Sequence, residues 1–297
     1  MEKQSLHIPV LVDEVTNLLD LQPGEVVIDA TVGDGGHANK ILEHINPGGF
    51  LLGIDRDPEA VTFTYEKLSI NQQSNQFAIR HGSYCDLDVI LKNCGYSGAD
   101  GILFDLGLSS RQLSNRRGFS FKETAPLDMR FDPESELTAE EIVNSYPKDK
   151  LANLLWEFGE ERASRRIADA IFKARQKNRI ATTTELADIV SSAKGGRKGK
   201  IHPATQTFQA LRIAVNQELE AIRETLPKAI DLLHPSGRLA VISYHSLEDR
   251  IVKQQFRNLY KQGQINLITK KPVRATRSEI LNNPRARSAK LRVIEKI

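Results

Sequence analysis

The chain has 297 residues, 40% of them hydrophobic, which is enough for about two domains with buried cores. Its 41 Lys and Arg exceed its 38 Asp and Glu by a formal charge of +3, so net charge alone does not imply nucleic-acid binding. Two cysteines, Cys85 and Cys94, exclude a disulfide-rich scaffold. No signal segment or apolar run of the ~20 residues that a membrane span needs is visible, so we expect a cytoplasmic soluble protein. The seven histidines show no metal-ligand spacing, and we expect no metal.

The first elements in chain order are a helix over residues 11–19 and a short buried strand over residues 26–28, which ends at Asp29. Glycines 33, 35 and 36 follow, and a helical pattern begins at once. Strand, glycine turn and helix form the first half of a βαβ unit, in which the backbone can approach a ligand closely. Because Gly-x-Gly-Gly is not the Gly-x-Gly-x-x-Gly of dinucleotide folds, a purely structural turn is the alternative at this point.

A second buried strand, residues 50–55, ends in another carboxylate. Asp55 lies about 20 residues beyond the glycine turn, where a nucleotide-binding fold places the acid that holds a ribose. Asp57 precedes Pro58 at the start of a new helix, which is typical of an N-cap. Asp55 is therefore expected at a ligand crevice, whereas Asp57 is expected to cap a helix.

Further strands are expected at residues 76–82 and 100–105, with Tyr84 in the loop between them. Strands that alternate with helices predict an α/β fold, a mostly parallel sheet with helices on both faces. Asp29, Asp55 and Asp105 would then lie together at the edge of the sheet where such folds bind ligands.

The alternation stops after Ser109, and no convincing strand appears before about residue 202. A polar loop is followed by helical patterns and by a basic segment over residues 194–200. We expect helices over residues 139–146, 148–158, 160–177 and 184–192. The whole region is predicted to be a helical insertion within the α/β domain.

The α/β pattern resumes after Pro203 with a long amphipathic helix over residues 208–230, which Pro227 should kink or divide. A fifth strand over residues 238–243, a helix over 246–260 and a final strand over 290–297 complete the pattern.

The acids at the sheet edge suit a ligand with ribose hydroxyls, an amine and a positive centre. S-adenosylmethionine has all three, whereas NAD would bring a pyrophosphate and require the longer glycine fingerprint. A P-loop is excluded because no Gly-Lys-Ser/Thr follows the glycines. Asp105 is the leading candidate for a catalytic residue, and Tyr244 and His245 are the further catalytic candidates. Ser246 and Asp249 resemble a helix cap, which would leave Tyr244 and His245 free to face the same edge.

Basic residues gather in the loop at Lys194, Arg197, Lys198 and Lys200, and in a C-terminal tail that includes Arg285 and Arg287. A solvated surface is the usual explanation for such charge. The two groups together favour a partner with a phosphate backbone.

Several motifs resemble the bacterial ribosomal small-subunit RNA (cytosine-N(4))-methyltransferase family, known as RsmH or MraW, over almost the whole chain. The motifs are His7-x-Pro9-Val10-Leu11, Gly33-x-Gly35-Gly36-His37, Asp100-Gly101-Ile102-Leu103-x-Asp105-Leu106-Gly107, Arg117-Gly118-Phe119-Ser120-Phe121, Pro126-Leu127-Asp128-Met129-Arg130, Gly159-Glu160-Glu161, His202-Pro203-Ala204-Thr205, Phe208-Gln209-Ala210-Leu211-Arg212, His245-Ser246-Leu247-Glu248-Asp249-Arg250 and Asn283-Pro284-Arg285-Ala286-Arg287-Ser288.

The resemblance implies a class I methyltransferase fold with an inserted helical domain. It divides the chain into a core at 1–111, an insertion for substrate recognition at 112–202 and a second core segment at 203–297. It also implies S-adenosylmethionine as the methyl donor, and Arg212 is expected among the RNA-binding residues. The cofactor contacts that it implies are Gly35, Gly36, His37, Asp55, Tyr84, Asp105 and Gln112.

The sequence departs from the family pattern at three positions. Tyr84 and Tyr244 stand where the family often has Phe, which preserves an aromatic face, and Arg111 stands where it usually has Pro. The segment Asp105-Leu106-Gly107-Leu108 keeps the acid of the Asp/Asn-Pro-Pro-aromatic motif of other amino-methyltransferases but lacks its prolines and its aromatic residue. Tyr244 is the candidate to stack on the target base.

The resemblance thus implies methylation of the exocyclic amine of a cytidine in the decoding region of 16S ribosomal RNA, within the small subunit. Two alternatives stay open: a methyltransferase that acts on protein or a small molecule, and a non-catalytic RNA-binding assembly factor. Methyl transfer to purified small subunits, compared with naked RNA and protein, separates the three.

Overall fold

The computed structural model describes residues 8–70, 75–114, 116–196 and 202–297, and the chain forms two compact units. The sheet unit consists of Met1–Ser109 and Leu219–Ile297, and the helical unit of Ser110–Glu218. The helical unit therefore extends beyond residue 202, where we expected the insertion to end. Each unit is described by itself.

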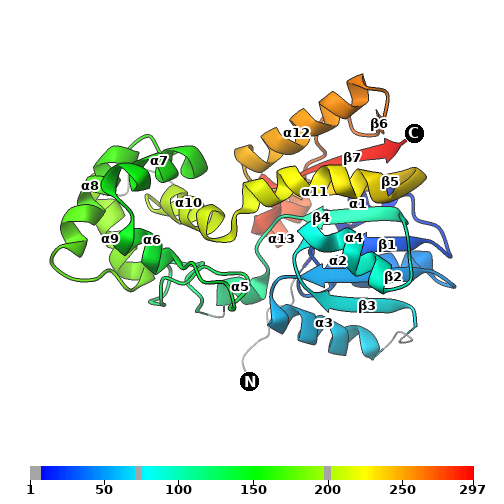
Figure 1. Cartoon of the computed structure of the whole chain (residues 1–297), viewed down its shortest axis with the longest axis horizontal. Coiled ribbons are helices and arrows are strands. Elements are labelled where there is room, and N and C mark those ends of the chain that lie inside the picture. Colours follow the sequence, from blue (N-terminus) through cyan, green and yellow to red (C-terminus); the bar gives the residue numbers. More distant parts are fainter. Residues whose placement is uncertain (1–7, 71–74, 115, 197–201) are drawn as a thin grey trace. The chain divides into compact units, whose positions relative to one another are not determined.

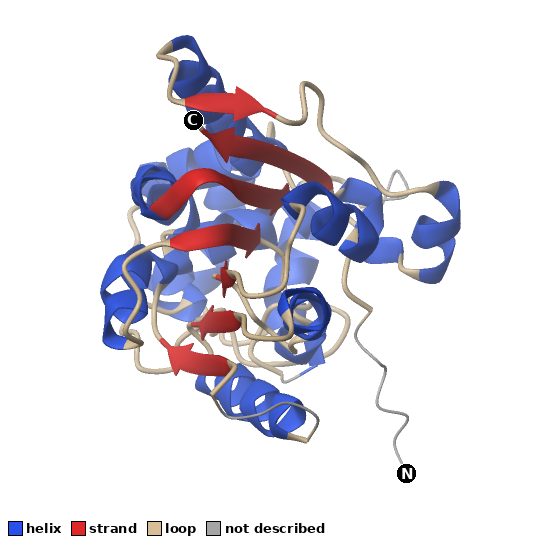
Figure 2. Cartoon of the chain, turned by 90° about the vertical axis from the view of Figure 1, so that its right-hand side faces the viewer, coloured by secondary structure: helices blue, strands red, loops and turns tan. Residues whose placement is uncertain are grey.

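The sheet unit contains one seven-stranded sheet in the order β3-β2-β1-β4-β5-β7-β6 (Figure 2). Strands β1 to β5 are parallel, and β7 runs antiparallel to both β5 and β6. Because the strand order reverses between β1 and β4, the crevice for a ligand is expected at their carboxyl ends. The strands are β1 (Val26–Asp29), β2 (Phe50–Asp55), β3 (Phe77–His81), β4 (Ala99–Asp105), β5 (Leu233–Ser243), β6 (Ile265–Leu267) and β7 (Lys290–Lys296).

Helices cover both faces of the sheet (Figure 1), which is why its central strands are continuous apolar runs. Alternate side chains such as Val27, Leu51 and Leu103 join a core cluster with α1 and α2 on one face; helices α4 and α11 cover the other (Figure 1). The helices of this unit are α1 (Val12–Leu19), α2 (Gly36–Ile45), α3 (Pro58–Ser69), α4 (Leu87–Asn93), α11 (Glu218–Leu232), α12 (Ser246–Lys261) and α13 (Arg277–Asn282), with 3-10 turns η1 (Tyr84–Asp86) and η2 (Pro284–Ser288).

The helical unit holds α5 (Ser110–Ser114), α6 (Ala139–Ser145), α7 (Lys148–Gly159), α8 (Ser164–Arg175), α9 (Thr183–Ala193) and α10 (Thr205–Asn216). Its described residues form no strand, only an isolated bridge between Pro126 and Thr182. The helix expected to begin at residue 160 begins instead at Ser164, because Glu160 takes a left-handed conformation (φ 49°) that ends α7. Among the described residues of either unit, no helix is both long and apolar enough to cross a membrane.

The long helix expected over residues 208–230 is in fact two helices, and Pro227, which we expected to kink or divide it, does not divide it. The break falls at Gln217, whose backbone is left-handed (φ 53°) and whose N–H bonds to the carbonyl of Ile213. Pro227 lies inside α11. Apolar spacing reports which side chains are buried and carries no information on one residue's φ, so the pattern ran unbroken across the turn.

Candidate active site

The glycine turn after β1 follows a backbone path that only glycine accommodates at Gly35. Gly35 has φ 72° and caps α2, and a Cβ atom there would lie 2.8 Å from Cγ2 of Thr64. The Thr64 hydroxyl donates a 2.6 Å hydrogen bond to the carbonyl of Gly33. A Cβ atom on Gly36 would lie 3.0 Å from Cβ of Pro9. The turn is therefore held closely between α3 and the N-terminal segment, with the first amides of α2 at its end.

Asp55, at the end of β2, ties this turn to the next helix. Its Oδ2 accepts a hydrogen bond from the amide of Gly33, and its Oδ1 accepts one from the amide of Asp57, both at 2.9 Å. Burial raises the pKa of Asp55 to about 6, although these two bonds act in the opposite direction. Each carboxylate oxygen keeps a second lone pair, so Asp55 can still accept bonds from ribose hydroxyls. Asp57 caps α3, as predicted, by accepting from the amide of Glu59.

Asp29 ends β1 beside the point where the strand order reverses, and it is 1% exposed. Burial raises its pKa to about 7, against the opposing effect of His37. Burial therefore favours the protonated form of this carboxyl far more than in an exposed aspartate.

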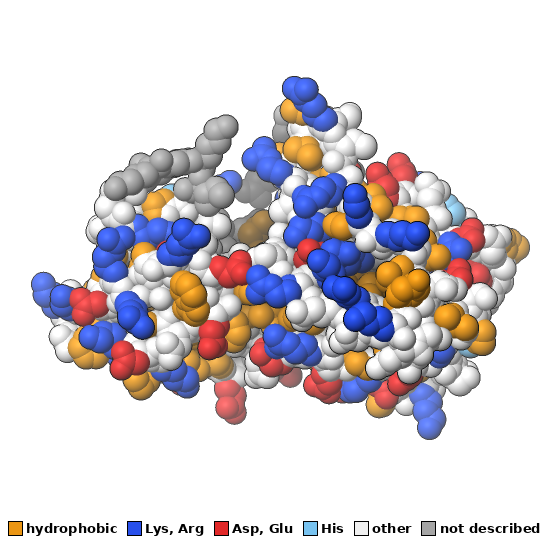
Figure 3. Space-filling model, turned by 90° about the horizontal axis from the view of Figure 1, so that it is seen from above, with side chains coloured by type: hydrophobic (Ala, Val, Ile, Leu, Met, Phe, Trp, Pro, Cys, Tyr) orange, Lys and Arg blue, Asp and Glu red, His pale blue; other side chains and the backbone are white. Residues whose placement is uncertain are grey.

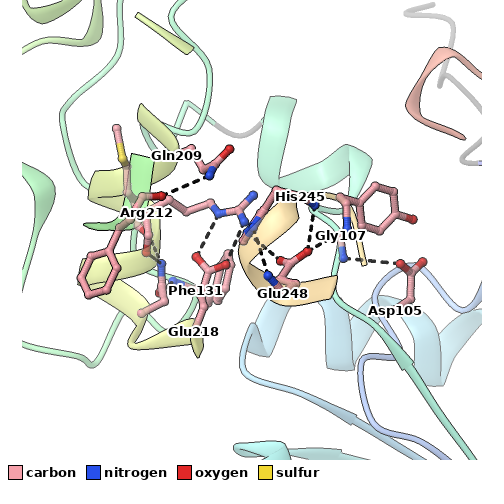
Figure 4. A network of polar contacts seen from close by, with 12 residues as sticks. Asp105, Gly107, Phe131, Gln209, Arg212, Glu218, His245 and Glu248 are labelled. Carbon is pink, nitrogen blue, oxygen red and sulfur yellow. Dashed lines mark hydrogen bonds and ion pairs between the residues drawn. The ribbon is translucent and has the colours of Figure 1, made fainter. Parts of the chain in front are cut away.

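Asp105, at the end of the neighbouring β4, is held on three sides. Its Oδ1 accepts a 3.4 Å bond from the amide of Gly107 (Figure 4), and its Oδ2 lies 3.6 Å from Nε2 of His37. Burial alone would raise its pKa, but His37 and the hydroxyl of Tyr244 outweigh burial and hold the pKa below its usual value. The Tyr244 ring lies so close that a Cβ atom on Gly107 would be 2.6 Å from it. Asp105 is thus an ionised carboxylate in a half-buried setting.

Tyr244 supports this charge as a neutral donor. Burial, together with the negative charge of Asp105, raises its pKa well above the usual value for a phenol. The pairing of β4 with β5 places Asp105 opposite Ile242, which brings Tyr244 to Asp105 from the next strand. The structure therefore brings together two of the three predicted catalytic residues, Asp105 and Tyr244.

His37 and Ser243 are among the residues of the sheet unit that have buried polar atoms without a hydrogen-bond partner in the described part of the chain. Neither ring nitrogen of His37 has a hydrogen-bond partner in the described chain, and the same is true of Oγ of Ser243, which ends β5. Buried polar atoms rarely stay unpaired in a native protein, and those near a crevice are expected to bond to a ligand or water. Ser243 was not among the predicted site residues because a strand-terminal serine carries no distinctive sequence signal.

His245 is not free to face the site as we expected. It is the N-cap of α12: its Nδ1 accepts from the amide of Glu248 at 3.4 Å, and its Nε2 lies 2.9 Å from Oε1 of Glu248 (Figure 4). The predicted cap, Ser246 with Asp249, is displaced by one residue. Asp249 instead pairs with Lys290 and Arg292 of β7. The position of the cap thus depends on charged partners of Asp249 on a strand that is distant in sequence. The local sequence pattern does not contain these partners.

The remaining predicted contacts are divided between the two units. The ring of Tyr84, on η1, meets Phe104 of β4 edge-on with centroids 5.5 Å apart. Gln112 is buried on α5 of the helical unit.

The tail arginines differ from each other. Burial lowers the pKa of Arg285, and electrostatic interactions with Tyr244, Asp34 and Asp105 act in the opposite direction. Nη1 of Arg285 is buried without a hydrogen-bond partner among the described residues. Arg287 is exposed. Arg285 therefore lies within the electrostatic reach of Asp105, a placement that its position in a basic tail did not predict.

Two of the predicted RNA-binding residues of the helical unit form ion pairs. Lys194 donates to the buried Glu161 at 2.5 Å, and the Arg212 guanidinium donates two bonds to Glu218, at 2.9 and 2.8 Å (Figure 4). These partners already compensate much of the charge of both cations. Arg197, Lys198 and Lys200 lie outside the described residues.

The strand order, the antiparallel β7 and the carboxylates at the reversal point define a class I S-adenosylmethionine-dependent methyltransferase fold, as predicted. The model of the MraW methylase family matches residues 4–297, and the chain belongs to this family. The resemblance seen in the motifs is thereby confirmed, and the chain is a methyltransferase.

Curated relatives match nearly the whole chain. Proteins named ribosomal RNA small subunit methyltransferase H are 48% identical in Dehalococcoides mccartyi (98% of this chain, 86% of theirs) and 47% identical in Persephonella marina (98% and 99%). A solved structure described as an rRNA methylase from Streptococcus thermophilus aligns with 100% of this chain and 99% of its own, at 12% identity and a TM-score of 0.46.

Proposed function

We propose that this enzyme transfers the methyl group of S-adenosylmethionine to the exocyclic amine (N4) of a cytidine in the decoding region of 16S ribosomal RNA, in the cytoplasm and within the small ribosomal subunit. The names of the relatives support a small-subunit ribosomal RNA as the acceptor. The observation that carries the proposal is the ionised Asp105 at the end of β4, supported by His37 and Tyr244.

The residues at the carboxyl edge of the sheet fit the cofactor. The ring nitrogens of His37 make no hydrogen bond within the described residues and lie beside the Asp105 carboxylate, so they can bond a polar ligand, and Asp55 keeps lone pairs for ribose hydroxyls. The first amides of α2, after Gly35 and Gly36, suit the ligand's carboxylate, and Tyr84 offers an aromatic face. When bound, S-adenosylmethionine supplies an electrophilic methyl group on a positively charged sulfur.

Asp105 would act on the acceptor amine. The lone pair of a cytosine amine is delocalised into the ring, so the amine is a poor nucleophile. A carboxylate that accepts its N–H bond helps to localise the lone pair on nitrogen. Tyr244 holds that carboxylate in place as a neutral donor, and a fixed geometry contributes several kcal/mol through alignment. The base must leave its stack to reach such a buried group.

Exposed basic side chains supply the surface for RNA. Lys and Arg side chains gather on the face shown in Figure 3. The outer side of α12 carries Arg250, Lys253, Arg257 and Lys261, all exposed and three or four residues apart. Together with the exposed Arg287 of the same unit, they would bind phosphates.

The test is methyl transfer from labelled S-adenosylmethionine to purified small subunits, naked 16S RNA and a ribosomal protein mixture, followed by nucleoside analysis. We expect N4-methylcytidine at one site of the RNA in the subunits. Label in protein alone would refute the RNA substrate. RNA binding without any transfer would instead identify a non-catalytic assembly factor.

A further inference from the structure

The helical unit has an open hollow of about 820 Å³ that none of the motifs or predicted site residues explains. It lies at α7 and the beginning of α8. It is lined by Ala152, Asn153, Trp156, Arg162, Ala163, Ser164, Arg165 and Arg166. Its size is within the range of pockets that bind small ligands, so it has room for a nucleotide.

Three of the lining side chains are exposed arginines, and the described residues that line the hollow include no acid. Among the described residues, Arg162, Arg165 and Arg166 have no hydrogen bond or ion pair of their side chains. The neighbouring Glu161 is 2% exposed and is bound to Lys194, so it does not neutralise them. Three cations within five residues are thus left for a partner outside the chain.

These arginines do not stabilise the helix on which they lie. Arg165 and Arg166 lie in the first turn of α8, and this turn contains no acidic residue. Positive charge at a helix N-terminus opposes the helix dipole, and neighbouring like charges repel each other. Acidic residues at these positions would instead stabilise a helix end that faced only solvent.

The remaining large side chain of the hollow is Trp156, the single tryptophan of the chain, which is 57% exposed. No described cation or aromatic ring lies against it. Exposed tryptophan beside unpaired arginine is typical of sites that bind single-stranded nucleic acid, because every base can stack on an indole while phosphates bind guanidinium groups.

We propose that this hollow binds unpaired nucleotides of the RNA substrate, with a base stacked on Trp156 and the adjacent phosphates on Arg162, Arg165 and Arg166. The inference rests on the proposed function, since it requires an RNA substrate, and it gives the helical unit a recognition site of its own. A duplex fits less well because its base faces are covered by stacking, and an acidic protein surface would leave the indole without a partner.

Because Trp156 is the only tryptophan, its intrinsic fluorescence reports directly on the hollow. The probe is a 12-nucleotide single-stranded oligouridine, with a blunt RNA duplex of equal length for comparison, and overall binding is followed by anisotropy of a labelled copy. We expect the oligouridine to quench the fluorescence with the same dissociation constant that anisotropy gives. The duplex should quench it less.

Two variants separate the two parts of the site. Trp156→Ala should weaken oligouridine binding about tenfold with an unchanged salt slope. Arg162→Gln/Arg165→Gln/Arg166→Gln should weaken it and reduce the salt slope by about 2, the sum of ~0.7 per phosphate contact. The matched control, Lys122→Gln/Lys173→Gln/Lys177→Gln, removes the same charge from exposed residues of the helical unit that do not line the hollow.

Binding by anisotropy without any change in tryptophan fluorescence would overturn the proposal, as would a triple arginine variant that equals its control. Unchanged thermal melting and S-adenosylmethionine affinity show that each variant is folded. If quenching and both variant effects appear while small subunits are not methylated, the site stands and the proposed substrate fails. If the wild type methylates subunits and the site variants match their control, the site fails alone.

Discussion

Replacing Asp105 by Asn tests the proposed chemistry with the least change in shape. The amide oxygen can still accept from the Gly107 amide, which now binds Oδ1 of Asp105 at 3.4 Å. The amide NH2 group then takes the place of Oδ2, which lies 3.6 Å from the His37 ring. The variant thus loses the negative charge and the second acceptor oxygen, Oδ2, while the side chain keeps its volume.

The expected loss is about 100-fold or more in kcat, or roughly 2.7 kcal/mol, the scale for removing one preorganised polar group from a buried site. The single-turnover methylation rate on small subunits measures it, with S-adenosylmethionine and RNA affinities determined in parallel. If Asp105→Asn melts normally, binds both substrates and methylates at the wild-type rate, Asp105 is not catalytic, and the group formed by Ser243 and Tyr244 becomes the candidate.

A pH series controls for a folding defect. Because the folded-state pKa of Asp105 is below its unfolded value, its charge stabilises the fold above the unfolded pKa. This contribution is lost as the pH falls through the folded pKa. The small stability difference between wild type and Asp105→Asn should therefore vanish in acid, whereas a packing defect would persist at every pH.

Three further predictions follow from the same edge of the sheet. Asp55→Ala should weaken S-adenosylmethionine binding by roughly 1.5–3 kcal/mol, the range for a hydrogen bond to a charged group, and unchanged calorimetric affinity in a folded variant would reject the ribose contact. Burial raises the pKa of Asp29 from 3.8 to about 7, so its contribution to stability is complete below about pH 4 and is lost as the pH rises through 7. Asp29→Asn should gain stability over the cofactor-free wild type by up to roughly 4 kcal/mol between pH 4 and 8 in urea titrations; parallel curves would contradict the burial argument. Gly35→Ala should lower the melting temperature, because alanine is strained at φ 72° and its Cβ atom would lie 2.8 Å from Cγ2 of Thr64. Thr64→Ser removes that methyl group and should restore part of the loss in melting temperature.

Local sequence signals determined much of this protein. The apolar run, the glycines and the acid at each strand end predicted the βαβ unit and the carboxylates Asp29, Asp55 and Asp105, because strands, turns and caps depend on residues close in sequence. The N-cap at Asp57 is confirmed for the same reason. The motifs identified the family, which the comparisons confirm.

Tertiary contacts decided what these signals do not contain. The pairing of Asp249 with β7 left His245 to cap α12, and the backbone of Gln217 broke a helix whose apolar spacing is continuous. The folded chain brought Arg285 within reach of the charge of Asp105 and placed the buried His37 3.6 Å from the same carboxylate. Burial, charge and hydrogen bonding act between residues that are distant in sequence, so these features exist only once the chain has folded.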